Sequence, residues 1–127
     1  FTMGGATSVD KEYRIPYSSW WPQELPDERN FDEARAKLDS VGWKVDYVVT
    51  HTCSTRMLSP TLYPAPGWNC PTVDRLTAFF DELEDRLDYK RWYYGHFHRD
   101  ANPAERHTVL YDCAVRLGDE LQPWDVA

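Results

Sequence analysis

The feature that most restricts the fold is a run from Arg91 to Asp100, in which strand-forming aromatic residues stop at a glycine and two histidines follow. Aromatic residues favour strands, and the glycine permits a turn where the strand ends. If the backbone stays extended beyond Gly95, His96 and His98 point to the same side. Neutral imidazoles are good ligands for zinc, manganese and iron. On this run alone, two partly buried histidines with satisfied hydrogen bonds explain the pattern equally well.

A second run, from Trp43 to Cys53, repeats this arrangement, because a β-branched and aromatic stretch ends in a polar turn with His51 at its exit. In open α/β sheets, ligands bind outside the carboxyl ends of the strands. We therefore predict a shared metal site that contains His51, His96 and His98. The fourth histidine, His107, stands at the entrance of a later strand, and we interpret it as structural.

The cysteines add little to this prediction. Cys53, Cys70 and Cys113 are odd in number and form no C-x-x-C pair, so the spacing of a zinc knuckle is absent. Cys53 follows His51 by two residues, which makes it a candidate ligand. Such a cysteine is more often a small buried hydrophobe.

Periodicity predicts helices between these strands. A strand that runs into a glycine turn is expected in 1–8 and an irregular segment in 9–26. An amphipathic helix is expected in 27–38, with Phe31, Ala34, Leu38 and then Val41 on one apolar stripe, and Gly42 ends it. Many prolines predict a long loop over 52–71, which we expect to cover the site or form its rim. A second helix is predicted after a Thr72 cap, with an apolar face made of Val73, Leu76, Phe79, Phe80, Leu83 and Leu87. A last strand is predicted over 107–117.

Length and charge limit the classes of function. The 127 residues are enough for one domain, and the order of elements indicates an α/β fold. The net charge of -7 and the absence of a basic patch argue against general binding to nucleic acid or to a membrane surface. A small phosphorylated substrate stays compatible, because bound cations would dominate the local field. The sequence shows no membrane-spanning run and no signal-peptide pattern, so we expect a cytoplasmic protein.

Three segments together, Gly4–Arg14, Thr50–Cys53 and Gly95–Asp100, resemble the carboxyl-terminal half of a calcineurin-like metallophosphoesterase. The resemblance implies that residues 1–127 are the carboxyl-terminal part of one domain, half of a four-layer αββα sandwich. It also implies hydrolysis of phosphomonoesters or phosphodiesters with two divalent metal ions (Mn, Fe or Zn). By this resemblance, His51 and His96 would ligate one ion and His98 the other.

The earlier motifs of that family, D-x-H, G-D-x-x-D and G-N-H-D/E, do not occur in the chain. They supply the remaining ligands, including the bridging aspartate, so we expect the chain alone to be inactive or poorly active. The abrupt first strand suggests that something upstream is absent. Because open strand edges seek partners, we expect self-association or pairing with a missing amino-terminal half. A chain that sediments as a monomer at high concentration would argue against self-association.

Three further residues near these motifs are candidates for supporting roles. Arg99 and Arg14 are candidates for neutralising a phosphate, and Asp100 for orienting a histidine, since metal-bound imidazoles usually need a hydrogen-bond partner.

Two other classes of protein fit parts of the pattern. One is a non-catalytic, truncated structural or binding module with relic histidines, which would fold stably without metal. The other is a cupin-like oxygenase, which also uses H-x-H with a third histidine. Cupins are nearly all strand, so the two amphipathic helices argue against that class.

Overall fold

The computed structural model describes residues 1–8, 10–62 and 73–126. The α-helices are α1 (Glu28–Ser40), α2 (Thr55–Leu62) and α3 (Arg75–Arg86). The strands are β1 (Thr2–Met3), β2 (Tyr47–Thr50), β3 (Arg91–Tyr94), β4 (Ala101–Ala104) and β5 (His107–Val109). Two short 3-10 helices cover Lys11–Tyr13 and Pro22–Glu24. This arrangement confirms the α/β class. None of the helices in these ranges is long and apolar enough to cross a membrane.

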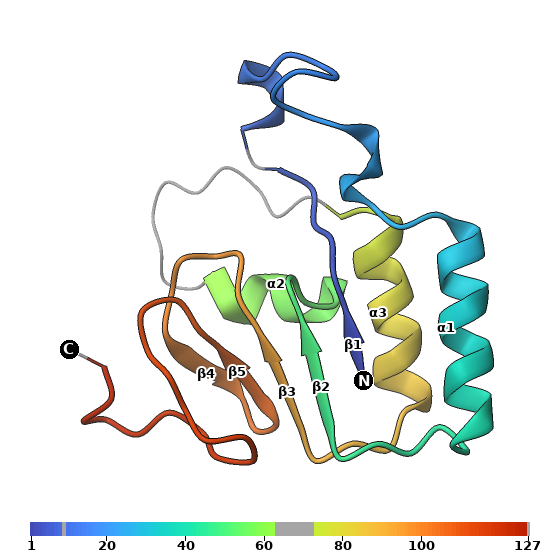
Figure 1. Ribbon diagram of the computed structural model, residues 1–127. Helices are drawn as coiled ribbons and strands as arrows, with labels where there is room; N and C mark the ends of the chain where they lie inside the picture. The colour runs from blue at the N-terminus through green and yellow to red at the C-terminus, as the bar shows by residue number, and fades with distance from the viewer. Residues whose placement is uncertain (9, 63–72, 127) are drawn as a thin grey trace.

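The five strands form one mixed sheet in the order β1-β2-β3-β5-β4 (Figure 1). The first four strands in that order are parallel, and β4 runs antiparallel to β5. Val48 pairs with Trp92, and Tyr93 pairs with Thr108. Because β1, β2 and β3 are parallel, their carboxyl ends meet at one edge of the sheet, where the segments containing His51 and His96 begin.

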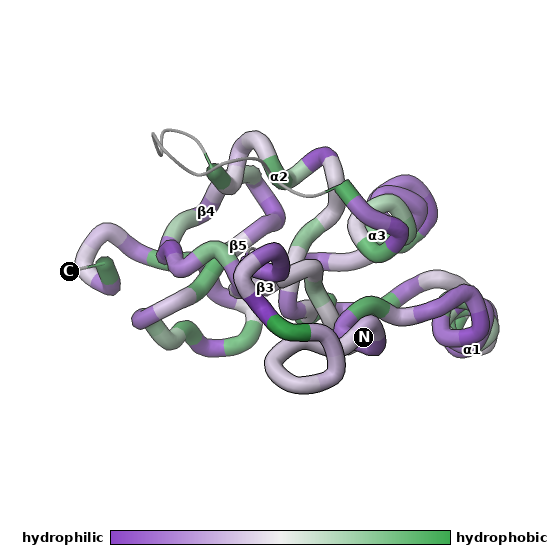
Figure 2. The backbone as a smooth tube through the Cα atoms, turned by 90° about the horizontal axis from the view of Figure 1, so that it is seen from above, coloured by the Kyte–Doolittle hydropathy of each residue, from purple (hydrophilic) through white to green (hydrophobic). Residues whose placement is uncertain are grey.

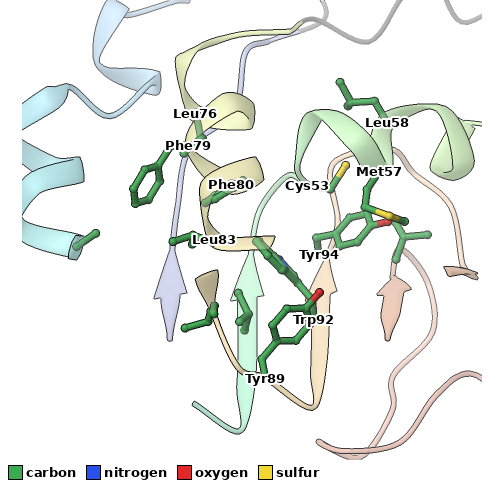
Figure 3. Close-up of a cluster of buried hydrophobic side chains, with 14 of the residues drawn as sticks. Cys53, Met57, Leu58, Leu76, Phe79, Phe80, Leu83, Tyr89, Trp92 and Tyr94 are labelled. Carbon is green, nitrogen blue, oxygen red and sulfur yellow. The ribbon is translucent and has the colours of Figure 1, made fainter. Parts of the chain in front are cut away.

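Helices α2 and α3 lie on one side of the line of strands (Figure 2). The strand residues that face them, including Trp92 and Val109, are fully buried. Phe80 of α3 meets Trp92 edge-on, with ring centroids 5.5 Å apart (Figure 3). The Thr61 hydroxyl of α2 and the Tyr94 hydroxyl of β3 share a buried hydrogen bond of 2.6 Å. Burial of these aromatic side chains contributes much of the folding free energy, since a fully buried large side chain adds roughly 1.5–3 kcal/mol.

The opposite face of the sheet is covered less completely. Val49, which points there, is 41% exposed. The carboxyl-terminal segment covers part of this face, because the Tyr93 hydroxyl donates to the Asp119 carbonyl and accepts from the Gly118 amide, both at 2.7 Å. Gly118 has a φ of +105°, and a Cβ there would lie 2.8 Å from the Tyr47 hydroxyl, so this close contact requires glycine.

Both predicted helices are present, and local capping explains their starts. Asp27 and Asn30 form a reciprocal capping box at α1. The predicted Thr72 cap lies outside the described residues, and Asp74 caps α3 by accepting from the amides of Leu76 and Thr77. Val73 precedes that cap and is 62% exposed, so its placement on the apolar face was wrong. The remaining residues predicted for that face are buried.

Two predictions about secondary structure need correction. Part of the predicted loop, Thr55–Leu62, is helix α2, because Met57, Leu58 and Thr61 form a buried stripe despite Pro60. Residues 52–54 of that loop are neither helix nor strand, as predicted, while 63–71 and the expected covering role lie outside the described residues. The predicted last strand is confined to β5, and β4 was missed because its Ala-Asn-Pro-Ala sequence carries little strand propensity. The proline is tolerated because β4 is an edge strand.

His107 is structural, as predicted. Its Nε2 lies 2.7 Å from a Glu84 carboxylate oxygen, and both side chains are more than 90% buried. Glu84 also accepts hydrogen bonds from the Tyr89 hydroxyl at 2.6 Å and the Ser54 hydroxyl at 3.1 Å. This buried network joins α3, β5 and the turn that follows His51.

The network makes stability depend on pH. Burial alone would raise the pKa of Glu84, but the hydrogen bonds from His107, Tyr89 and Ser54 outweigh it, so the pKa lies below its ordinary value. A carboxyl group with a lowered folded pKa contributes stability above its unfolded pKa, about 4.3, and loses it as pH falls through the folded pKa. We expect the urea midpoint to fall in that acidic window. In Glu84→Gln the urea midpoint should depend less on pH in that window. An equal dependence of the midpoint on pH in both proteins would contradict the role of the Glu84 carboxylate.

Candidate metal centre

His51 and His96 face each other at the carboxyl edge of the sheet. His51 is the first residue after β2, and His96 is the second residue after β3. His51 Nε2 lies 3.2 Å from His96 Nδ1, and the ring centroids are 5.0 Å apart. The Gly95 amide donates to the His51 carbonyl at 3.0 Å, which ties the two strand exits together. The structure thus brings together two of the three predicted ligands.

The backbone after β3 is not extended. The prediction that His96 and His98 point to the same side assumed an extended backbone there. Their φ angles are +72° and +49°, which is the left-handed region. Phe97 between them is buried in the core, so the chain bends to bury that ring. Non-glycine residues in this region are uncommon and cluster at functional sites.

His98 has a different setting from the pair. Its ring is exposed and stacks on Tyr111, with centroids 4.5 Å apart and an interplanar angle of 18°. Within residues 1–8, 10–62 and 73–126, no group of three or more His, Cys, Asp or Glu side chains could hold a metal ion. The predicted three-histidine cluster is therefore reduced to a pair in this structure.

Electrostatics favour the neutral form of His96. Burial lowers the pKa of His96 most strongly, and positive charge on His51 and His98 lowers it further. Asp74 and Glu24 oppose the shift, but the net direction is downward. At neutral pH the imidazole therefore keeps the lone pair that a metal ligand needs.

The separation of the two nitrogens fits one zinc ion. Two nitrogens bound to tetrahedral zinc at roughly 2.0–2.1 Å lie about 3.3 Å apart. The observed distance between His51 Nε2 and His96 Nδ1 is 3.2 Å. The pair can fill two of four positions, and further ligands would have to come from elsewhere. The same separation also accommodates an N–H···N hydrogen bond between two neutral rings, which is the non-metal interpretation.

Cys53 is not placed to act as a ligand. It is 1% exposed and belongs to the hydrophobic core. Burial raises the pKa of its thiol to about 12, so the thiolate that binds metal is strongly disfavoured. Cys113 is half-buried, and its thiol lies 2.8 Å from the Asp125 carbonyl oxygen. Cys70 lies outside the described residues.

The three supporting candidates each have a defined partner. Asp100 accepts hydrogen bonds from the backbone amides of 111–113, so its carboxylate holds the loop that carries Tyr111. Arg99 Nη1 donates to the Thr61 carbonyl at 2.6 Å. Arg14 pairs with Asp10 at 2.7 Å in the segment that rises above the sheet edge (Figure 1).

Sequence reasoning missed two carboxylates near the pair. Glu24 and Asp74 lie close enough for their charges to act on His96. Ser8 donates to Glu24 and Thr7 donates to Asp74, each at 2.6 Å, so the segment after β1 anchors both groups. No motif marked Glu24, and the capping role of Asp74 was assigned to Thr72.

The fold and this edge define an α/β domain with a histidine pair at the carboxyl ends of adjacent parallel strands. The chain matches no family model, no curated protein and no solved structure. A function must therefore be argued from the geometry of the pair and the chemistry of its neighbours.

Proposed function

We propose that the chain is the metal-binding part of a metal-dependent phosphoester hydrolase that acts on a small phosphomonoester or phosphodiester. The observation that carries the proposal is the 3.2 Å separation of His51 Nε2 and His96 Nδ1 at the carboxyl edge of parallel strands. The resemblance of three ordered segments to calcineurin-like metallophosphoesterases supplies the reaction class.

Each residue then has a role. His51 and His96 would hold one ion, with the neutral imidazole of His96 ready to bind. The resemblance assigns His98 to a second ion. A divalent ion (Mn, Fe or Zn) supplies Lewis acidity and lowers the pKa of bound water when present. Arg14 and Arg99 remain the candidates for a phosphate contact by charge, and Asp100 acts on the loop beside His98.

We also propose that the remaining ligands come from pairing, with a second copy or with an amino-terminal half that completes the αββα sandwich. The support is that β1 is an edge strand and that Val49 is 41% exposed on the less covered face.

We also propose a cytoplasmic location. The free thiols of Cys53 and Cys113 fit a reducing compartment.

A non-catalytic module is the second candidate function. It is favoured by the hydrogen-bond interpretation of the pair, in which His51 and His96 satisfy each other without a metal. The two functions differ in whether metal changes the stability of the protein, because a ligand that binds only the folded state raises its melting temperature.

An assay with chromogenic aryl phosphomonoesters and phosphodiesters tests the proposal. With manganese or zinc, we expect slow hydrolysis that disappears on chelation and in His96→Ala, because the pair supplies only part of a site. Turnover retained in His96→Ala would contradict the role of the pair. A chain that neither hydrolyses these esters nor gains thermal stability from metal would correspond to the non-catalytic module.

A further inference from the structure

We propose that Thr50 is a positioning residue that fixes the His51 imidazole against His96, an inference that rests on the proposed function. The Thr50 hydroxyl accepts from the Trp92 indole Nε1 at 2.8 Å and donates to the Thr52 carbonyl at 2.5 Å. Thr50 and Thr52 are buried, while His51 between them is exposed. The hydroxyl therefore clamps the two residues on either side of the histidine.

The chemistry of the groups decides which atom donates in each of these two hydrogen bonds. An indole N–H can only donate, so the single proton of the Thr50 hydroxyl is left for the Thr52 carbonyl. The donor of the first hydrogen bond is held in place by packing, because Trp92 is fully buried between Phe80 and Tyr89 (Figure 3). In this buried setting, water does not compete for the bonds, and an unsatisfied group is costly.

The Gly95 amide completes the clamp. It donates to the His51 carbonyl at 3.0 Å, so the backbone of His51 is held from β3 while its neighbours are held through Thr50. Outer groups that orient metal-binding histidines typically change metal affinity by about 10–100-fold when they are removed. Thr50 acts on the backbone turn and does not touch the imidazole.

Three variants separate positioning from general stability. Thr50→Val keeps the shape but removes the hydroxyl, and Thr50→Ser keeps the hydroxyl. Thr108→Val is the matched control, because Thr108 is also fully buried and its hydroxyl accepts from Arg91 and donates to Asn102. We expect zinc affinity, measured by competition with a chromogenic chelator, to fall about tenfold in Thr50→Val and to be preserved in the other two.

Hydrogen exchange of the Gly95 amide is the second readout, and it requires no metal. At conditions chosen to give all variants the same global stability, we expect the Gly95 amide to exchange faster in Thr50→Val than in the parent. In Thr108→Val it should exchange at the parent's rate. If the parent protein binds no zinc, the proposed function fails, and the exchange rates alone decide the positioning role. Equal zinc affinity in Thr50→Val and parent, or equal Gly95 protection in Thr50→Val and Thr108→Val, would overturn the inference.

Discussion

Replacing His96 with alanine should lower the zinc affinity of the chain by more than about 100-fold, because loss of a supporting residue alone costs about 10–100-fold. The imidazole contributes one of the two nitrogens that lie 3.2 Å apart, and alanine offers no donor atom. A competition titration with a chromogenic chelator measures the loss, and circular dichroism checks the fold.

Two controls make this result specific. Since His96 has a φ of +72°, alanine also introduces backbone strain, and His96→Asn avoids most of it because asparagine tolerates the left-handed region. His96→Asn should therefore lose zinc affinity as well. His98 also has a positive φ, +49°, so His98→Asn is the variant that removes its ring from Tyr111, and it should preserve binding of the first ion. Parental zinc affinity in both His96 variants would contradict the role of the pair.

Removing the Glu84 side chain should cost about 3 kcal/mol of unfolding free energy, because each buried polar group that loses its hydrogen-bond partner costs about 1–3 kcal/mol. Glu84→Ala leaves the buried groups of His107, Tyr89 and Ser54 without their common acceptor. Urea denaturation at neutral pH measures the loss through the shift of the midpoint at constant slope.

Glu82 provides the matched control for that measurement, because it lies two residues earlier on α3. Its carboxylate pairs with Arg35 and Arg86 at the surface, where ion pairs contribute about 0–1 kcal/mol. Glu82→Ala should therefore cost much less than Glu84→Ala. Similar losses in the two variants would mean that the buried network contributes no more than a surface ion pair.

The sequence predicted those parts of the fold whose signal is local and periodic. Of the four residues expected on one stripe of the first helix, Phe31, Ala34 and Leu38 are buried in α1, but Val41 at its C-cap is 52% exposed, so its place on the stripe was wrong. The aromatic runs before His51 and Gly95 are strands. Helix α2 and strand β4 were missed because Pro60 and Pro103 weaken local propensity. Tertiary packing overrides that propensity, since α2 buries Met57 and Leu58 and β4 pairs with β5.

For the site, the position of each histidine at a strand exit carried most of the predictive information. Parallel neighbours bring their carboxyl ends together, so the sequence pattern alone is enough to place His51 near His96. The orientation of His98 could not be predicted, because it depends on how Phe97 is buried and on a contact with Tyr111 far along the chain. The hydrogen bonds of the Thr50 hydroxyl could not be predicted either, because they depend on Trp92 lying beside it.

Metal content per chain, determined by elemental analysis after incubation with zinc or manganese and desalting, shows whether the histidine pair binds a metal ion. We expect about one ion per chain, held by His51 and His96 and lost in His96→Ala. A ratio near two would show that a pairing partner supplies the remaining ligands. A chain that retains no metal while keeping its fold would contradict the role of His51 and His96 as metal ligands, and would leave the 3.2 Å contact between them as a hydrogen bond alone.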